Sequence, residues 1–207
     1  MSLFTSKHVV RLAAIAALAA FPLLAAPALA VELGAAELQR LNARDVIVRV
    51  EADPSGEADG SIDAAIDVAA PPARLWSVML DCQRALIFIE GLKSCRVLER
   101  GPNDAWDIRE HKSKWLAILP ELRSVFRSDY KANSEIKFRR VDGDIRFLEG
   151  QWKLQPLAGG TATRLTYRAR IGISAPVPGF MLRAALESDV PKRLKALRAE
   201  AEHGNTK

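Results

Sequence analysis

The sequence predicts an α+β domain in which a curved antiparallel β-sheet wraps around a long C-terminal helix, with two short helices after the first strands. Two observations lead to this fold class. Residues 95–173 consist of alternating or β-branched segments separated by turn sequences at 101–104 and 141–144. Residues 178–202 carry apolar side chains at helical spacing. Because an antiparallel sheet has one face to bury, a long helix can cover it, and a cavity can remain between them.

The first segment of the chain, residues 1–30, has the order of charges and apolar residues that is typical of a secretory signal peptide. Lys7 and Arg11 precede an apolar stretch, which ends in the small-x-small sequence Ala-Leu-Ala at Ala30. We therefore expect cleavage between Ala30 and Val31 and a periplasmic mature protein.

A membrane anchor is the alternative for this segment, because the uncharged run 12–31 is long enough to cross a bilayer. However, the run is mostly alanine, and Pro22 and Pro27 interrupt its second half. No stop-transfer cluster of charges follows it, so cleavage is the favoured interpretation.

A short helix, two strands and two short helices are expected next. β-branched residues favour the first strand, and alternation of Ile62 and Ile66 with Asp63 and Asp67 gives the second strand one apolar face. Pro72 suits the first turn of the following helix. The expected helices lie at 33–41, 74–80 and 83–90, and the strands at 46–50 and 61–70.

Six strands and the long helix complete the predicted order. The strands are expected at 95–100, 106–111, 123–130, 135–140, 145–154 and 163–173, before the helix at 178–202. Near the end of this helix lies a basic cluster, which we interpret as solvent-facing; its members are Lys192, Arg193, Lys195 and Arg198.

Alternation along the strands predicts which side chains point toward the helix. On the strand 106–111, Trp106 and Ile108 are expected to point inward with Glu110 as the polar member of that row, which places Arg109 and His111 on the opposite face. The predicted cavity residues are Trp76, Phe88, Trp106, Ile108, Glu110, Phe126, Leu148, Trp152, Leu165, Tyr167, Met181 and Leu186. Ordinary core packing is the alternative for each aromatic residue among them.

Composition limits the partners of the mature protein. Removing residues 1–30 leaves 177 residues, enough for one domain, with 28 basic and 25 acidic side chains. This small positive charge does not favour a nucleic-acid partner. We expect a monomer.

The two cysteines, Cys82 and Cys95, are predicted to form a disulfide, because an oxidising compartment favours their pairing. Two buried free thiols are the alternative. No Cys-x-x-Cys occurs, and His111 and His203 have no ligand spacing, so we expect neither a metal nor another cofactor.

One stretch has the pattern of a membrane-contacting loop. Trp115, Leu116 and Ile118 lie between basic residues at 112, 114 and 123. Such a loop could enter an anionic leaflet transiently while the basic side chains meet headgroups. Its alternative role is a lid that packs on the domain's own core.

Several segments resemble the START-like (SRPBCC, helix-grip) superfamily, in its polyketide cyclase and coenzyme-Q-binding branch. They are residues 66–76, 80–82, 88–99, 150–154 and 160–167, in the family's order and spacing. The resemblance implies a helix-grip ligand-binding domain at 45–203, after an N-terminal extension at 31–44. The proline-and-aromatic pattern of the family is missing at 84–90, a loop that borders the cavity, so the resemblance does not carry over the identity of the ligand.

These features predict periplasmic binding or transport of a hydrophobic small molecule, such as a lipid, a quinone or a polyketide-like compound. No nucleophile–base pair and no paired carboxylates stand at a convincing spacing, so catalytic residues are not assigned. Two alternatives stay open. One is a cyclase or aromatase that uses Glu110, His111 or Tyr167, and the other is an interaction module whose cavity is filled by its own side chains.

Overall fold

The structure, a computed structural model, describes residues 31–53, 55–114, 121–174 and 178–203. The predicted signal segment 1–30 and the predicted membrane-contact residues Trp115, Leu116 and Ile118 lie outside these ranges. The predicted cleavage site lies at their boundary, where Val31 is the first described residue.

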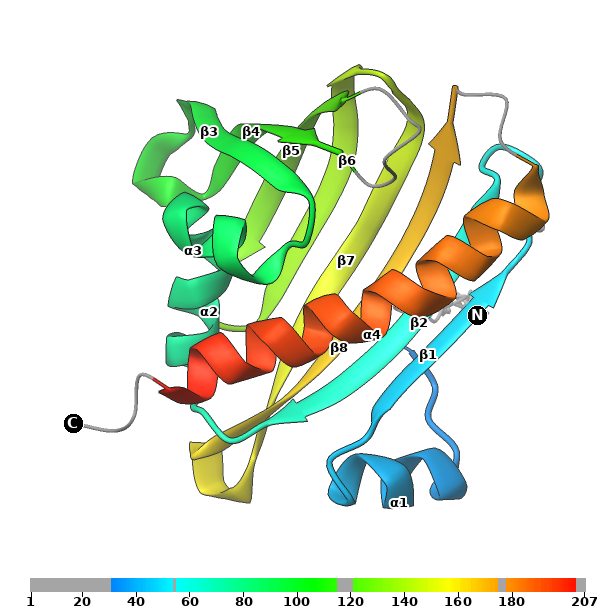
Figure 1. Cartoon of the computed structure of the whole chain (residues 1–207). Coiled ribbons are helices and arrows are strands. Elements are labelled where there is room, and N and C mark those ends of the chain that lie inside the picture. Colours follow the sequence, from blue (N-terminus) through cyan, green and yellow to red (C-terminus); the bar gives the residue numbers. More distant parts are fainter. Residues whose placement is uncertain (1–30, 54, 115–120, 175–177, 204–207) are drawn as a thin grey trace, which may run out of the picture.

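One antiparallel sheet of eight strands forms the body of the domain, in the order β1-β2-β8-β7-β6-β5-β4-β3. Figure 1 shows the sheet curving around the long helix α4, which confirms the predicted fold class. The strands are β1 (Val46–Glu51), β2 (Gly60–Val68), β3 (Leu92–Arg100), β4 (Trp106–Ser113), β5 (Leu122–Lys131), β6 (Glu135–Gly143), β7 (Ile145–Leu157) and β8 (Ala162–Ile173). The helices are α1 (Ala35–Asn42), α2 (Pro72–Leu80), α3 (Cys82–Phe88) and α4 (Gly179–His203), with short 3₁₀ turns η1 (Pro102–Asp104) and η2 (Ala158–Gly160).

Helix α4 packs on the concave face of the sheet through side chains spaced by three or four residues. Its buried members are Leu182, Leu186, Val190, Leu194, Leu197 and Ala201. Met181 was predicted to point inward, and this prediction is wrong, because Met181 precedes the buried row by one position, about 100° around the helix. Its side chain is 40% exposed, and that of Phe180 is 74% exposed.

Helices α2 and α3 connect β2 to the edge strand β3 and close one end of the curved sheet (Figure 1). Pro71 occupies the N-cap position of α2 without a side-chain hydrogen bond, and the carboxylate of Asp81 caps α3 by accepting hydrogen bonds from the backbone N–H groups of Gln83 and Arg84. The predicted disulfide is confirmed: Cys82 at the start of α3 is bonded to Cys95 in β3, with the Cα atoms 5.3 Å apart. The bond attaches α3 directly to the sheet.

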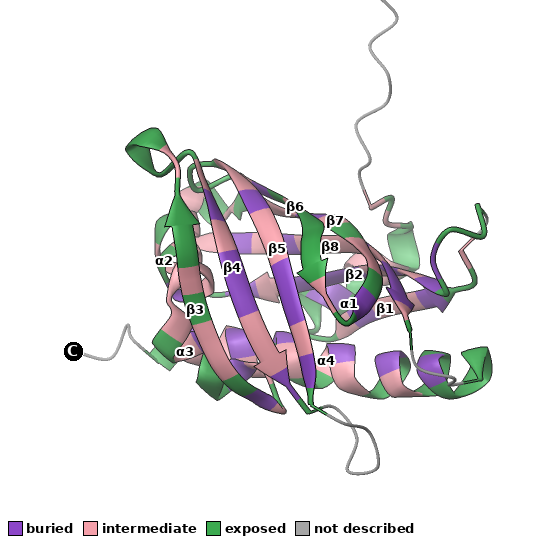
Figure 2. Ribbon diagram, turned by 90° about the horizontal axis from the view of Figure 1, so that it is seen from above, coloured by how far each residue is buried: buried purple, intermediate pink, exposed green. Residues whose placement is uncertain are grey.

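On the outer face of the sheet, α1 packs against β1 and β2, and ion pairs link neighbouring strands. Leu41 of α1 packs with Ile47 and Ala65 in a small second core, so the segment before β1 is part of the folded domain. The outward arginines of β8 face aspartates of β2 in direct register: Arg164 pairs with Asp67 and Arg168 with Asp63. In Figure 2 the edge strand β3 is mainly exposed, whereas β4 and β5 alternate buried and intermediate residues.

Candidate ligand cavity

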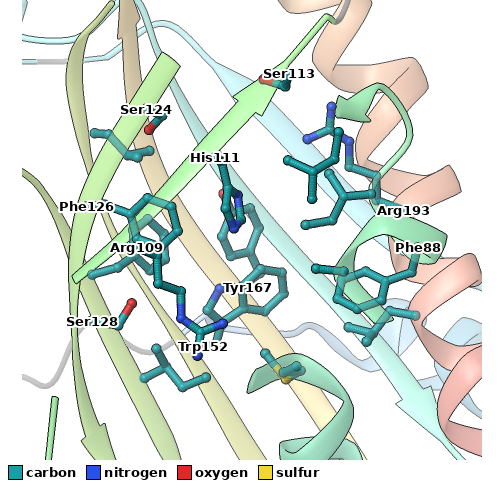
Figure 3. A pocket seen from close by; sticks show the side chains of 18 of the residues that line it. Phe88, Arg109, His111, Ser113, Ser124, Phe126, Ser128, Trp152, Tyr167 and Arg193 are labelled. Carbon is teal, nitrogen blue, oxygen red and sulfur yellow. The ribbon is translucent and has the colours of Figure 1, made fainter. Parts of the chain in front are cut away.

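A cavity of about 260 Å³ lies between α4, the two short helices and the concave face of the sheet. Figure 3 shows side chains from α3, α4 and the strands converging on it. Most of its walls are apolar, with Phe88 and Ile89 on one side and Leu186 and Val190 of α4 on another. A concave, mostly apolar space with a few polar groups is the general form of a small-molecule site.

Five rings, one from each of five neighbouring strands, form the floor of the cavity, and we call this set the aromatic row. It consists of His111, Phe126, Phe138, Trp152 and Tyr167. Trp152 and Tyr167 are stacked with ring centroids 4.0 Å apart, and His111 meets Phe126 edge to face at 4.9 Å. Phe138 fits into the row because its register partner is Gly150, where a Cβ atom would come within 2.6 Å of the ring.

In β4, the alternate residues that face the cavity are not the ones that were expected to face it. Arg109, His111 and Ser113 point into the cavity, and Trp106, Ile108 and Glu110 lie on the outer side of the strand. The prediction that Trp106, Ile108 and Glu110 line the cavity is therefore wrong.

Ion pairs on the outer face explain why Glu110 and its row point away from the cavity. Glu110 accepts hydrogen bonds from Arg96 of β3 and, at 2.6 Å, from Arg123 of β5, on the outer face. These two bonds lower the pKa of Glu110 to about 2. Trp106 is covered on the same face by the guanidinium of Arg127, 4.1 Å from its ring centroid.

Six of the predicted cavity residues do line the cavity, and three others lie outside the lining for reasons of packing. The six are Phe88, Phe126, Leu148, Trp152, Tyr167 and Leu186. Leu165 is 1% exposed but belongs to the close-packed core. Trp76 packs against this core and meets Tyr130 edge to face, and Met181 is on the outer side of α4.

The cavity contains basic side chains that the sequence analysis had assigned elsewhere. Arg109 is buried and donates a hydrogen bond of 2.8 Å to the buried carboxylate of Asp107. Arg193 enters from α4, although its cluster was interpreted as solvent-facing (Figure 3). Its position seven residues after Leu186 could have indicated this, because residues two turns apart share a helix face.

His111 stands among these charges as a neutral ring. Burial, and then the positive charges of Arg109 and Arg193, lower the pKa of His111 from 6.5 to about 4. Its Nε2 atom is buried and has no hydrogen-bond partner in the described part of the chain. In the view of Figure 3 the imidazole lies between the two arginines.

The remaining polar groups of the lining are hydroxyls. Ser113, Ser124 and Ser128 come from β4 and β5, and Tyr130 and Tyr167 complete the set. Burial raises the pKa of Tyr167 to about 12, so this side chain keeps its proton at neutral pH. Within the described residues, no group of three or more His, Cys, Asp or Glu side chains could hold a metal ion.

Comparisons with known proteins agree with this geometry. The family model described as polyketide cyclase / dehydrase and lipid transport matches residues 68–198. No curated protein matches the sequence at a significant level. No helix in the described ranges is long and apolar enough to span a membrane.

Solved structures show a similar fold at low sequence identity. A START superfamily protein from Mycobacterium smegmatis has a TM-score of 0.61 at 20% identity, over 70% of this chain and 99% of that one. The Zhui aromatase/cyclase from Streptomyces sp. R1128 has a TM-score of 0.57 at 20% identity, and the match covers 69% of this chain and 93% of that one. A STAR-related lipid transfer protein fragment from Xanthomonas axonopodis has a TM-score of 0.60 at 18% identity, and the match covers 75% of this chain and 92% of that one. At these identities the likeness establishes the fold.

Proposed function

The chain belongs to the polyketide cyclase / dehydrase and lipid transport family, and from this premise we propose that it binds a hydrophobic small molecule in the cavity beneath α4 and carries it without chemical change. The observation that supports the proposal most directly is the largely apolar cavity over the aromatic row. Rings and aliphatic side chains bind an apolar molecule by removing its surface from water. The lipid transfer protein of Xanthomonas axonopodis, which has a similar fold, is consistent with carriage of such a ligand.

We place this activity in the periplasm. The charge order of residues 1–30 and the disulfide between Cys82 and Cys95 both support export to an oxidising compartment. A monomeric carrier there would take its ligand from a membrane surface, and transient contact through the stretch around Trp115 is part of the same proposal.

A cyclase-like activity is the second candidate, and His111 is the observation that favours it. A neutral imidazole beside guanidinium groups can polarise a substrate carbonyl by donating a hydrogen bond, and the positive charge can stabilise the enolate that the substrate forms on losing a proton to water. Glu110, considered for this role from the sequence, lies on the outer face and takes no part. The aromatase/cyclase with a similar fold supports keeping this alternative.

Filling the cavity tests the proposal. We expect mature protein to bind the uncharged fluorescent probe N-phenyl-1-naphthylamine, and Leu148→Trp to weaken this binding at least about tenfold, because the larger side chain occupies the ligand's space. Leu98→Trp is the matched control, since Leu98 is 49% exposed and outside the lining.

Mass spectrometry of the purified protein completes the experiment by identifying a co-purified ligand before and after incubation. An unchanged ligand supports the carrier, and conversion of the ligand supports the cyclase. If the native protein binds no probe and yields no apolar ligand, or if both tryptophan variants bind the probe as the native protein does, the proposal is wrong. Circular dichroism establishes that each variant is folded.

A further inference from the structure

The permanently charged side chains among the described residues that line the cavity are both arginines. Arg109 and Arg193 reach the lining from opposite walls, one from β4 and the other from α4. None of the residues that line the cavity in the described part of the chain is an aspartate or a glutamate. An arginine carries five N–H donors and no acceptor, and it stays protonated at any physiological pH.

The carboxylates that influence these arginines lie outside the lining. Asp107 binds Arg109 from within β4, and so it holds that side chain in place while leaving it at the cavity wall. The charges of Asp189 and Glu90 act on Arg193, and Asp189 also lies 3.8 Å from Lys192 at the protein surface. Among the described residues that line the cavity, the permanently charged groups are therefore guanidinium groups, while Asp107 is buried beside Arg109 and keeps one carboxylate oxygen without a hydrogen-bond partner there.

His111, whose imidazole lies between the two arginines in the view of Figure 3, adds a further polar atom. Its Nε2 is buried without a hydrogen-bond partner among the described residues, which is a costly state for a polar atom unless a ligand or water completes it. Most of the other lining side chains are apolar, and they include Phe88, Ile89 and Leu148. The cavity thus combines a few basic and polar side chains with walls that are otherwise apolar.

We propose that the ligand is a single-chain or small-ring apolar molecule with one carboxylate, which binds against Arg109, His111 and Arg193 while the apolar part lies over the other four rings of the aromatic row. This inference rests on the proposed function and specifies the substrate class. Guanidinium groups form the strongest protein hydrogen bonds with carboxylates and phosphates. A phospholipid with two chains does not suit a cavity of about 260 Å³, which is near the lower limit for drug-sized ligands.

Paired ligands that differ only in the head group test this inference. We use decanoate and decanol, each displacing N-phenyl-1-naphthylamine from the mature protein at pH 7. We expect decanoate to bind at least about tenfold more tightly than decanol, because a charge-assisted hydrogen bond to arginine forms only with the acid.

The variant Arg193→Gln tests whether the preference for decanoate arises in the cavity. This variant is expected to weaken decanoate binding about tenfold or more and to change decanol binding less than about threefold. Lys195→Gln is the matched control, because it removes one positive charge from an exposed position of the same helix, and it should alter neither affinity. Circular dichroism of both variants checks that α4 is intact.

The outcomes separate the inference from the proposed function. If decanol binds as tightly as decanoate, or if Arg193→Gln weakens both ligands equally, the carboxylate is not recognised and the inference is wrong, while the apolar carrier stands. If neither decanoate nor decanol displaces the probe, the inference is wrong, even where the native protein binds the probe. Failure of the native protein to bind the probe contradicts the proposed function as well.

Discussion

At the scale of single residues, His111 determines how the cavity responds to pH. Its pKa is about 4 in the folded protein, against 6.5 for a solvated histidine. The unfolded chain therefore binds the proton first as the pH falls. By linkage, the stability that depends on a neutral His111 is fully present above about pH 6.5 and is lost progressively toward pH 4.

We expect His111→Gln to remove this contribution. A pKa difference of this size corresponds to about 3 kcal/mol, so the unfolding free energy of the native protein should fall more steeply between pH 6.5 and pH 4 than that of the variant, by up to about this amount. Urea denaturation at several pH values gives the measurement. His203→Gln, at an exposed position near the end of α4, is the control and should follow the native curve. Equal pH slopes for the native protein and His111→Gln would contradict this assignment.

The error in β4 also belongs to this scale. Alternation correctly divided the strand into two sets, and it placed Arg109 and His111 opposite Glu110. Choosing the inner set by hydrophobicity then failed, because the outer set is stabilised by cross-strand partners. Arg96 and Arg123, on the two neighbouring strands, become partners of Glu110 only once the sheet is assembled. The alternation within one strand contains no information about these partners. It also gives no sign that an arginine side chain lines a cavity.

At the scale of elements, α3 links the disulfide to the binding site. It is a helix of seven residues, too short to be stable alone, and it contributes Ala85 and Phe88 to the cavity wall. Its position depends on the Asp81 cap, on packing against α4 and on the bond from Cys82 to Cys95 in β3. Loss of the bond should therefore affect both stability and ligand binding.

We expect the double variant Cys82→Ala, Cys95→Ala to lose about 3 kcal/mol of unfolding free energy, the value for closing a loop of this length. Probe binding should weaken in the same variant, because the wall that holds Phe88 is less constrained. Urea denaturation and probe titration measure the two effects. Dithiothreitol should reproduce both in the native protein and change neither in the double variant. A variant with native stability and native affinity would mean that the bond does not support α3.

At the scale of the whole molecule, the fold could be predicted because its largest features are periodic in sequence. The strands of the sheet and the long helix each bury one face, and the turns between them have distinctive residues. The order of the elements and the fold class could therefore be predicted from the sequence. The contents of the cavity could not be predicted to the same degree. Whether Leu165 packs or Leu148 lines a cavity depends on how strongly the sheet curves, and that curvature is set by all eight strands together.

The proposed export concerns the whole chain, and it would determine whether the disulfide can form and where the cavity meets its ligand. We expect bacterial cells that express residues 1–207 to contain a periplasmic protein that begins at Val31 and has Cys82 bonded to Cys95. N-terminal sequencing and thiol labelling of the periplasmic fraction measure both properties. The paired substitution Ala28→Phe, Ala30→Phe should block processing, because signal peptidase requires small residues at these two positions. Leu29→Phe, at the intervening position, should be processed normally. Unprocessed protein in the cytoplasm with both thiols reduced would contradict the periplasmic assignment, and the carrier would then have to act on ligands inside the cell.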